Sequence, residues 1–346
     1  MGVQKQIAVL PGDGIGPEVT NQAVRVLDTI AKKYHHQFSF QFALMGADAI
    51  DKTGEPLPDA TLQLCKSSDA VLFGAVGHPK YDQDPNAKVR PEQGLLKLRK
   101  ELGLFANIRP VTTYASLHHL SPIKSNLLEH VDFEIFRELT GGIYFGNKEL
   151  SADGNSAMDT CTYHVDEISR IAHLAFKRAQ QRKRKLTLVD KANVLETSRL
   201  WRKTVNDISS SYPEVEVHQM FVDNAAMQLI INPAQFDVIL TENMFGDILS
   251  DEASVLAGSL GLLPSASIGS GTALFEPIHG SYPQAAGRDI ANPSGAILSA
   301  ALMLDHFGLH QEASELRSGI EWTISNSFVT MDIDPINFYF TSTIGE

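Results

Sequence analysis

The chain has 346 residues, of which 43% are hydrophobic and 20% are charged, and its formal net charge is −12 at pH 7. These values are typical of a globular protein with a large core, organised as one large domain or two ordinary ones. The acidic balance argues against a surface for nucleic acid or anionic membranes, because phosphate binding needs a concentrated positive field.

The cysteine content and the apolar runs indicate the compartment. Cys65 and Cys161 form no CxxC pair, so the sequence predicts neither a disulfide framework nor a zinc knuckle. The N-terminus leads directly into a predicted strand, and no apolar run approaches the roughly 18 residues of a membrane span. We therefore expect a cytoplasmic protein.

Short β-rich runs alternate with longer helical patterns along the whole chain, which predicts an α/β fold with a parallel or mixed sheet. No repeat, low-complexity segment or Ser/Gly linker marks a clean domain boundary, so any two domains are expected to share a sheet. The basic run at 177–185 is interpreted as a solvated helix end. The main predicted strands are 5–10, 38–45, 70–76, 105–111, 132–139, 185–192, 215–221 and 236–242, and the main predicted helices are 17–33, 59–66, 166–181 and 293–307.

The segment PGDGIGPE at 11–18 follows a strand and opens a helix. Its glycines, Gly12, Gly14 and Gly16, do not have the GxGxxG spacing of a Rossmann fingerprint, and no acidic residue ends the next strand as that fingerprint requires. A backbone cradle for an anion and a tight turn without a ligand both explain the segment. Walker A, HExxH, GxSxG and EF-hand patterns are absent, which excludes the commoner phosphoryl-transfer, zinc-hydrolase and serine-hydrolase functions.

Asp247 and Asp251 lie four residues apart in the segment TENMFGDILSDEAS, on a predicted helix that Asn243 is placed to cap. Like charges at this spacing destabilise a helix by roughly 0.2–0.5 kcal/mol, so another interaction should favour them. One explanation is a solvated acidic face near the helix N-terminus. The other is a divalent cation. Asp223, in a strand-to-helix position, could then complete an oxygen site for Mg²⁺ or Mn²⁺.

Three arginines indicate how a substrate could bind. Arg99 lies in a predicted helix, and Arg109 and Arg137 lie in or at the ends of predicted strands. Because the guanidinium group binds carboxylates in a bidentate manner, this set suits a dicarboxylate. Leu95 and Leu96 precede Arg99 by four and three residues, so one helix face offers an apolar patch beside a cation. Core packing is the alternative explanation for the leucines.

Tyr144 and Lys191 are candidate acid and base groups, in the segments TGGIYFG and VDKANV. Their reference pKa values are about 10 and about 10.4, so each needs a nearby cation or desolvation to exchange protons at neutral pH. A bound metal and the arginines would supply that environment. A purely structural role is the alternative for each residue.

Several segments together resemble the β-decarboxylating dehydrogenase family, which includes the isocitrate and isopropylmalate dehydrogenases. The resemblance spans nearly the whole chain. It implies a two-domain α/β/α sandwich that is not a Rossmann fold, with residues 1–105 and 258–346 binding the cofactor and 106–257 carrying the substrate, metal and dimerisation surfaces. The segments that carry it are GDGIGPE, PEQGLLKLRKELGLFANIRPV, RELTGGIYFG, VDKANVL, FVDNAAM, TENMFGDILSDE, GLLPSAS and FEPIHGSYPQAAGRDIANPSGAILSAA.

The activity implied by the resemblance is a metal-dependent, NAD-linked oxidation and decarboxylation in leucine biosynthesis, in a homodimer whose active sites draw on both subunits. Asp247 and Asp251 match the metal ligands of one subunit and Asp223 the ligand of the other. Tyr144 matches the acid that protonates the enol, and Lys191 matches the partner-subunit residue that accepts the hydroxyl proton. The resemblance also assigns Arg99, Arg109 and Arg137 to the substrate carboxylates, and Leu95, Leu96 and Val194 to an isopropyl group.

The cofactor residues follow from the same resemblance. Ile15 falls in the turn near the nicotinamide, and His279, Gly280, Ser281 and Asn292 fall in the segment for adenosine. Gln284 departs from the family pattern, in which NAD-dependent members usually have an aspartate. Leucines near the substrate favour isopropylmalate over isocitrate, while tartrate, malate or homoisocitrate as substrate, or a silent metal-binding protein of this fold, are the alternatives.

Overall fold

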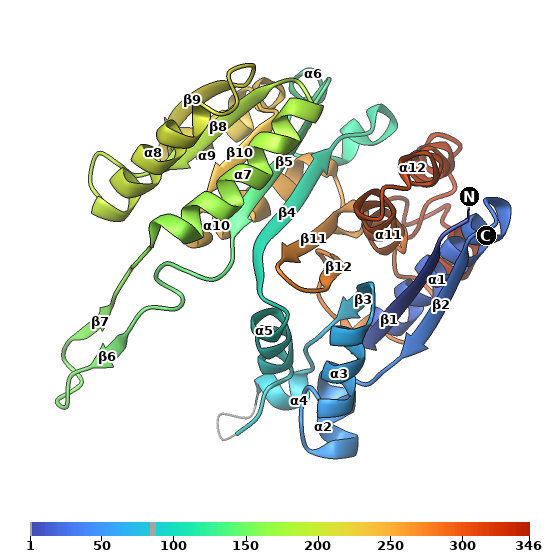
Figure 1. Cartoon of the computed structure of the whole chain (residues 1–346). Coiled ribbons are helices and arrows are strands. Elements are labelled where there is room, and N and C mark those ends of the chain that lie inside the picture. Colours follow the sequence, from blue (N-terminus) through green and yellow to red (C-terminus); the bar gives the residue numbers. More distant parts are fainter. Residues whose placement is uncertain (1, 84–87) are drawn as a thin grey trace. The chain divides into compact units, whose positions relative to one another are not determined.

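A computed structural model describes residues 2–83 and 88–346 of the chain (Figure 1). The backbone divides into two compact units, unit 1 (Met1–Leu104 with Ala257–Glu346) and unit 2 (Phe105–Leu256). The division expected from the sequence placed its boundaries after residues 105 and 257. The roles assigned to the two domains stay predictions. Among the described residues, no helix is both long enough and apolar enough to cross a membrane.

In unit 1 the strands lie in the order β2-β1-β3-β12-β11. β1 pairs in parallel with β2 and β3, β12 pairs in parallel with β3, and β11 pairs antiparallel with β12. Every residue of β3 is buried, as its continuous apolar run predicts for a sheet covered on both faces. The strands are β1 (Gln4–Gly12), β2 (Gln37–Phe42), β3 (Ala70–Ala75), β11 (Pro264–Gly269) and β12 (Ala273–Pro277).

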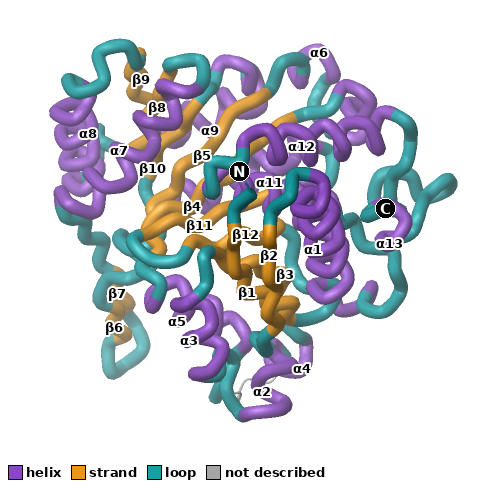
Figure 2. The backbone as a smooth tube through the Cα atoms, turned by 45° about the vertical axis from the view of Figure 1, so that its right-hand side comes forward, coloured by secondary structure: helices purple, strands orange, loops and turns teal. Residues whose placement is uncertain are grey.

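The largest helices of unit 1 pack beside one another (Figure 2). α11, an almost wholly buried helix, contacts both α1 and α12 and also covers β11 and β12. α1 starts with Pro17 in its first turn, as predicted, because proline there lacks only an N–H that the helix would leave unpaired. The helices are α1 (Gly16–Lys33), α2 (Ala47–Thr53), α3 (Asp59–Ser67), α4 (Pro79–Asp82), α5 (Pro91–Glu101), α11 (Ser294–His306), α12 (His310–Ser325) and α13 (Thr341–Ile344).

In unit 2 the strands lie in the order β4-β5-β10-β8-β9, with β4 antiparallel to β5 and the other pairs parallel. An exposed hairpin is formed by β6 and β7. The strands are β4 (Leu104–Thr112), β5 (Asp132–Glu138), β6 (Lys148–Leu150), β7 (Ala157–Asp159), β8 (Lys185–Asp190), β9 (Glu216–Phe221) and β10 (Val238–Thr241). The helices are α6 (Ser125–Leu128), α7 (Val165–Gln181), α8 (Glu196–Ser209), α9 (Val222–Ile231) and α10 (Asn243–Ser254).

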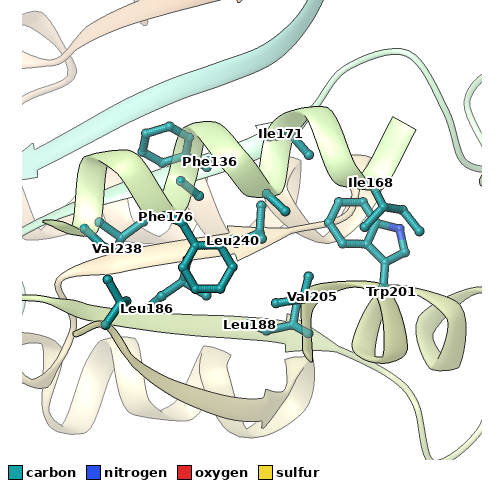
Figure 3. Close-up of a cluster of buried hydrophobic side chains, with 14 of the residues drawn as sticks. Phe136, Ile168, Ile171, Phe176, Leu186, Leu188, Trp201, Val205, Val238 and Leu240 are labelled. Atoms are coloured by element: carbon teal, nitrogen blue, oxygen red, sulfur yellow. The ribbon is translucent and has the colours of Figure 1, made fainter. Parts of the chain in front are cut away.

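The sheet of unit 2 has one apolar core on each face, because successive side chains of a strand point to opposite faces. Phe136 of β5 belongs to the same cluster as Phe176 of α7 and Trp201 of α8 (Figure 3), whereas Ile135 belongs to the cluster that includes Leu249 of α10. Neighbouring residues of a strand point to opposite faces, so each face receives its own helices. The predicted α/β fold with a mixed sheet is confirmed.

The interpretation of the basic run at 177–185 as a solvated helix end is wrong for two of its residues. Nε of Arg178 donates to Glu134 at 2.8 Å, and Nε of Arg182 donates to Asp237 at 2.8 Å. Glu134 and Asp237 are buried, and a buried carboxylate requires a paired cation. These arginines therefore neutralise carboxylates at the starts of β5 and β10.

Candidate functional site

Two of the predicted arginines lie on adjacent strands of unit 2. In the antiparallel register Asn107 of β4 stands opposite Arg137 of β5. Arg109 is two residues beyond Asn107, so all three side chains lie on one face of the sheet. Nε of Arg109 donates to Oδ1 of Asn107 at 2.9 Å. The strand register thus brings two guanidinium groups side by side, as binding of a dicarboxylate would need.

The two aspartates of α10 meet these arginines one to one. Asp247 pairs with Nη1 of Arg137, and Asp251 pairs with Nη1 of Arg109 at 3.1 Å. The helix lies close to β5 because residue 246 is glycine. A Cβ at Gly246 would lie 2.7 Å from Cβ of Arg137, closer than real side chains approach. The absence of a side chain at this position therefore sets the distance between the carboxylates and the arginines.

Asn243 does not cap α10, so that prediction is wrong. Glu242 occupies the cap position, and no side-chain hydrogen bond closes the helix end there. Oδ1 of Asn243 instead accepts from Nε and Nη2 of Arg137 at 3.1 and 3.0 Å, and its Nδ2 donates to the carbonyl of Gly141 at 3.2 Å. The buried amide therefore orients Arg137 and anchors the loop that carries Tyr144.

Tyr144 completes this cluster, since its hydroxyl donates to Oδ2 of Asp247 at 2.9 Å. Burial, and then the hydrogen bond to Asp247, raises the Tyr144 pKa above its usual value, although the Arg137 guanidinium lies 6.0 Å from the ring centroid. In the chain alone the carboxylate thus outweighs the arginine. Tyr144 keeps its proton at neutral pH, which suits a proton donor.

Lys191 and Asp223 form a separate pair, 2.7 Å from Nζ to Oδ1. The hydrogen bond from Lys191 lowers the Asp223 pKa. In the described part of the chain, no three acidic, histidine or cysteine side chains lie close enough together to hold a metal ion. Asp223 therefore does not join Asp247 and Asp251 within one chain, and its assignment to the metal site of a partner subunit stays a prediction.

The donor chemistry of α10 fits a hard divalent cation. Asp247 and Asp251 supply acceptor-only carboxylates on successive turns of one helix face, and their side chains are 36% and 71% exposed. Mg²⁺ and Mn²⁺ prefer such oxygen ligands together with water. Because one chain offers only this pair here, further ligands would come from substrate, water or another subunit.

The third arginine and the leucines lie on α5 in unit 1. Nη2 of Arg99 pairs with Oε1 of Glu276 at 2.7 Å, while its buried Nε has no hydrogen-bond partner among the described residues. A buried unpaired donor is costly unless a ligand satisfies it. Leu96 is 56% exposed, whereas Leu95 packs partly against a core cluster that includes Leu98. The two leucines thus differ in exposure, and of the two only Leu96 has most of its surface open to solvent.

Backbone groups of the turn at 11–18 form hydrogen bonds within the protein. The N–H groups of Asp13, Ile15 and Gly16 donate to the carbonyls of Ala75, Ser281 and Asp13. The carboxylate of Asp13, a residue missed in the sequence, accepts from the N–H groups of Ala47, Asp48 and Gly77 at 2.9, 3.1 and 3.0 Å. These bonds favour the tight turn over an anion cradle, and they place buried Ile15 beside Ser281.

The predicted adenosine segment follows β12. Oδ1 of Asn292 accepts from the N–H of Ser294 at the start of α11. Nδ1 of His279 lies 3.0 Å from the carbonyl of Gly280, and burial lowers the His279 pKa, so the ring is neutral at pH 7. Gln284 is exposed. Glu18 of α1, another residue missed in the sequence, accepts from the N–H groups of Gly287 and Asp289 and so fixes the turn after Gln284.

A buried network lies behind Lys191. Ser198 of α8 donates to Oε1 of Glu242, and its Oγ accepts from the N–H of Lys191 at 3.1 Å. Burial, and to a smaller extent Asp190, raises the Glu242 pKa to about 7, although the bond from Ser198 opposes this. Asp190 is itself paired with Arg202. The network therefore contains a carboxyl group that titrates near neutral pH.

We expect Glu242→Gln to remove a pH-dependent loss of stability. The folded protein holds the Glu242 proton more tightly than the unfolded chain, so wild-type stability should fall as pH rises from 4.5 through about 7. The gain on substitution should be small at pH 5 and reach about 3 kcal/mol at pH 8. Denaturant unfolding at both pH values measures it, and an equal gain at both would contradict the titration of Glu242.

The sequence is similar to a known family and to named enzymes of that family. Residues 6–346 match the family described as Isocitrate/isopropylmalate dehydrogenase. The 3-isopropylmalate dehydrogenase of Bacteroides fragilis (strain YCH46) is 53% identical over 328 residues, covering 95% of this chain and 92% of the relative. That of Bacillus subtilis (strain 168) is 52% identical over 337 residues, covering 96% and 92%.

Solved structures agree with the sequence relatives. Isocitrate dehydrogenase from Methylococcus capsulatus superposes with a TM-score of 0.86 at 33% identity, over 99% of this chain and 97% of that one. The β-decarboxylating dehydrogenase from Thermococcus kodakarensis, in its apo form, gives a TM-score of 0.83 at 38% identity, over 99% and 94%. The chain therefore belongs to the isocitrate/isopropylmalate dehydrogenase family.

Proposed function

We propose that the protein catalyses the metal-dependent, NAD-linked oxidative decarboxylation of 3-isopropylmalate to 4-methyl-2-oxopentanoate (2-oxoisocaproate) and CO₂, in leucine biosynthesis. The observation that carries the proposal is the cluster in unit 2, where Arg109 and Arg137 each hold one aspartate of α10 and Tyr144 donates to Asp247. The names of relatives at 52% and 53% identity support the substrate.

Each group of the chain then has a definite task. Asp247 and Asp251 would hold a divalent cation, which would lower the pKa of the substrate hydroxyl, and bound NAD would serve as the hydride acceptor. Arg109 and Arg137 orient the substrate carboxylates through bidentate contacts, with Arg99 as the third cation. Lys191 accepts the hydroxyl proton, and Tyr144 donates its phenolic proton to the carbon that CO₂ has left.

A homodimer with shared active sites is part of the proposal. Among the described residues Asp223 forms no metal-binding group with the α10 carboxylates, and Lys191 pairs with Asp223, which supports the family assignment of both residues to the partner's site. Exposed apolar side chains on the contacting helices α9 and α10 support an interface there, because an interface would remove their surface from water. The exposed apolar residues on these helices are Met227, Ile230, Ile231 and Ile248.

The test is NADH formation by the purified protein. 3-Isopropylmalate with NAD and Mg²⁺ or Mn²⁺ should give NADH and CO₂ together, and EDTA should abolish both. Isocitrate, malate, tartrate and homoisocitrate form the comparison set. Faster turnover of any of these would reassign the substrate, and turnover that survives EDTA would overturn the metal dependence.

Substitution of the exposed pocket residues should change substrate selectivity. Leu96 and Val194 are 56% and 60% exposed, so an isopropyl group can cover them. Leu96→Asn and Val194→Asn should lower kcat/KM for 3-isopropylmalate by about 10–200-fold. Malate, which lacks the branch, should lose much less and serves as the internal control. Equal losses for both substrates would show that these side chains only support the fold.

With glutamine at position 284, we expect the protein to prefer NAD over NADP by a moderate margin. An aspartate here would attract the adenosine ribose and repel the 2′-phosphate of NADP, whereas uncharged glutamine gives only a weaker attraction. Arg288, also exposed, could reach that phosphate. Gln284→Asp should therefore raise the ratio of kcat/KM for NAD over NADP, mainly by suppressing use of NADP. An unchanged ratio, or wild-type preference for NADP, would contradict this assignment.

A further inference from the structure

The backbone of Lys191 is tied to the start of α10 through one buried hydroxyl group. Lys191 directly follows β8 and Glu242 directly follows β10, and these parallel neighbours are in register at Val189 and Thr241. Both residues therefore emerge at the same edge of the sheet. Ser198, on the first turns of α8, fills the space beside them with no exposed surface.

The direction of the two hydrogen bonds is fixed by chemistry. Glu242 is acceptor-only when ionised and the Lys191 N–H is donor-only, so the Ser198 hydroxyl donates to Oε1 of Glu242 and accepts from Lys191 at 3.1 Å. With its proton committed to Glu242, the Ser198 oxygen presents its lone pairs to the Lys191 N–H. The two bonds therefore depend on one another.

The other contacts of this turn hold different atoms. The carbonyl of Lys191 accepts from the N–H groups of Val194 and Leu195, both at 2.9 Å. Asp190 accepts from the N–H of Ala192 at 3.0 Å and forms a two-point pair with Arg202. The Lys191 N–H donates to Oγ of Ser198, its hydrogen-bond partner among the described residues. Ser198 thus holds the backbone nitrogen of Lys191, while Asp223 holds its Nζ at 2.7 Å.

We propose that Ser198 and Glu242 form a positioning pair that aims Lys191 for proton transfer. The role rests on the proposed function, which makes Lys191 the acceptor of the hydroxyl proton. Neither residue touches substrate or cofactor in this scheme; each acts through the backbone of Lys191. A displacement of about 1 Å at a reacting group can cost roughly 100-fold in rate, so a small backbone shift is sufficient.

The test compares Ser198→Ala with Ser209→Ala, a control in the same helix whose hydroxyl donates to the local carbonyl of Asn206. Ser198→Ala should lower kcat by about 10–100-fold with KM little changed, and Ser209→Ala should change neither. Hydrogen exchange of the peptide containing residues 190–192 should be faster in Ser198→Ala only. Glu242→Ala should reproduce both effects, whereas Glu242→Gln, which keeps an oxygen acceptor, should preserve kcat.

A second comparison separates positioning from general destabilisation. In a Lys191→Ala background, Ser198→Ala should cause no further loss of kcat, because its effect passes through the missing amine. The same fold-loss in both backgrounds would overturn the proposal, as would full kcat or unchanged exchange in Ser198→Ala. Failure of the wild-type protein to oxidise 3-isopropylmalate would instead overturn the proposed function, and the role of Lys191 with it. Should Ser198→Ala not fold, the contrast between Glu242→Ala and Glu242→Gln decides.

Discussion

Asp251→Asn should lower kcat by about 10²–10³-fold and leave the fold intact. The amide keeps the shape of the carboxylate but loses the charge that a divalent cation needs. The side chain is 71% exposed, so water screens its ion pair with Arg109 and stability should change by less than about 1 kcal/mol. Steady-state kinetics across a Mn²⁺ titration, with calorimetric Mn²⁺ binding, measures the effect.

The matched control for this variant is Asp207→Asn. Asp207 is also exposed and also pairs with a cation, Lys203 at 2.8 Å, but it lies on α8. It should keep wild-type kcat and wild-type Mn²⁺ affinity. If Asp251→Asn behaves in the same way, the α10 carboxylates form only a solvated acidic face.

Two inactive variants should restore activity when they share a dimer. Lys191→Ala and Tyr144→Ala homodimers should each lose about 10²–10⁴-fold in kcat, as expected for a missing proton-transfer group. The proposed active site takes Lys191 from one chain and Tyr144 from the other. A hybrid therefore has one site with both defects and one with neither. Unfolding and refolding an equal mixture should recover roughly a quarter of wild-type activity, by random pairing of a twofold dimer.

The control mixture combines Lys191→Ala with Asp223→Asn. These two residues pair within one chain and are assigned to the same site, so their hybrid leaves one defect in each site. It should recover no activity although it assembles equally well. Recovery in this control, or none in the Lys191→Ala and Tyr144→Ala mixture once mass spectrometry has shown hybrids, would contradict the shared site.

The sequence predicted which residues form the cluster of arginines and aspartates in unit 2, but not how they pair. Asp247 and Asp251 share a helix face because they are four residues apart, and Arg109 and Arg137 lie in strands, as predicted. Which strands are neighbours, and in which register, depends on contacts between distant segments. The sequence therefore predicted the residues of the cluster but not the pairing of each arginine with one aspartate.

The missed residues have a common cause. Asn243 fits a helix cap by local preference, yet its amide serves Arg137, which is 106 residues away. Asp13 and Glu18 look like ordinary residues of a turn and a first helical turn, although each accepts from backbone N–H groups of remote segments. Local sequence patterns predict the hydrogen bonds that a side chain forms within its own helix or turn, whereas these side chains form hydrogen bonds with other elements.

The contact at Gly246 restricts how this site can change during evolution. Any side chain there would meet Cβ and Cγ of Arg137, both 2.7 Å from the position of a Cβ, and Cγ2 of Thr241 at 3.0 Å. Relief would require the whole helix to retreat, which moves both aspartates of α10 together. A substitution at position 246 would therefore change the spacing of carboxylates and arginines as a whole, so variation within this cluster is confined to positions other than 246.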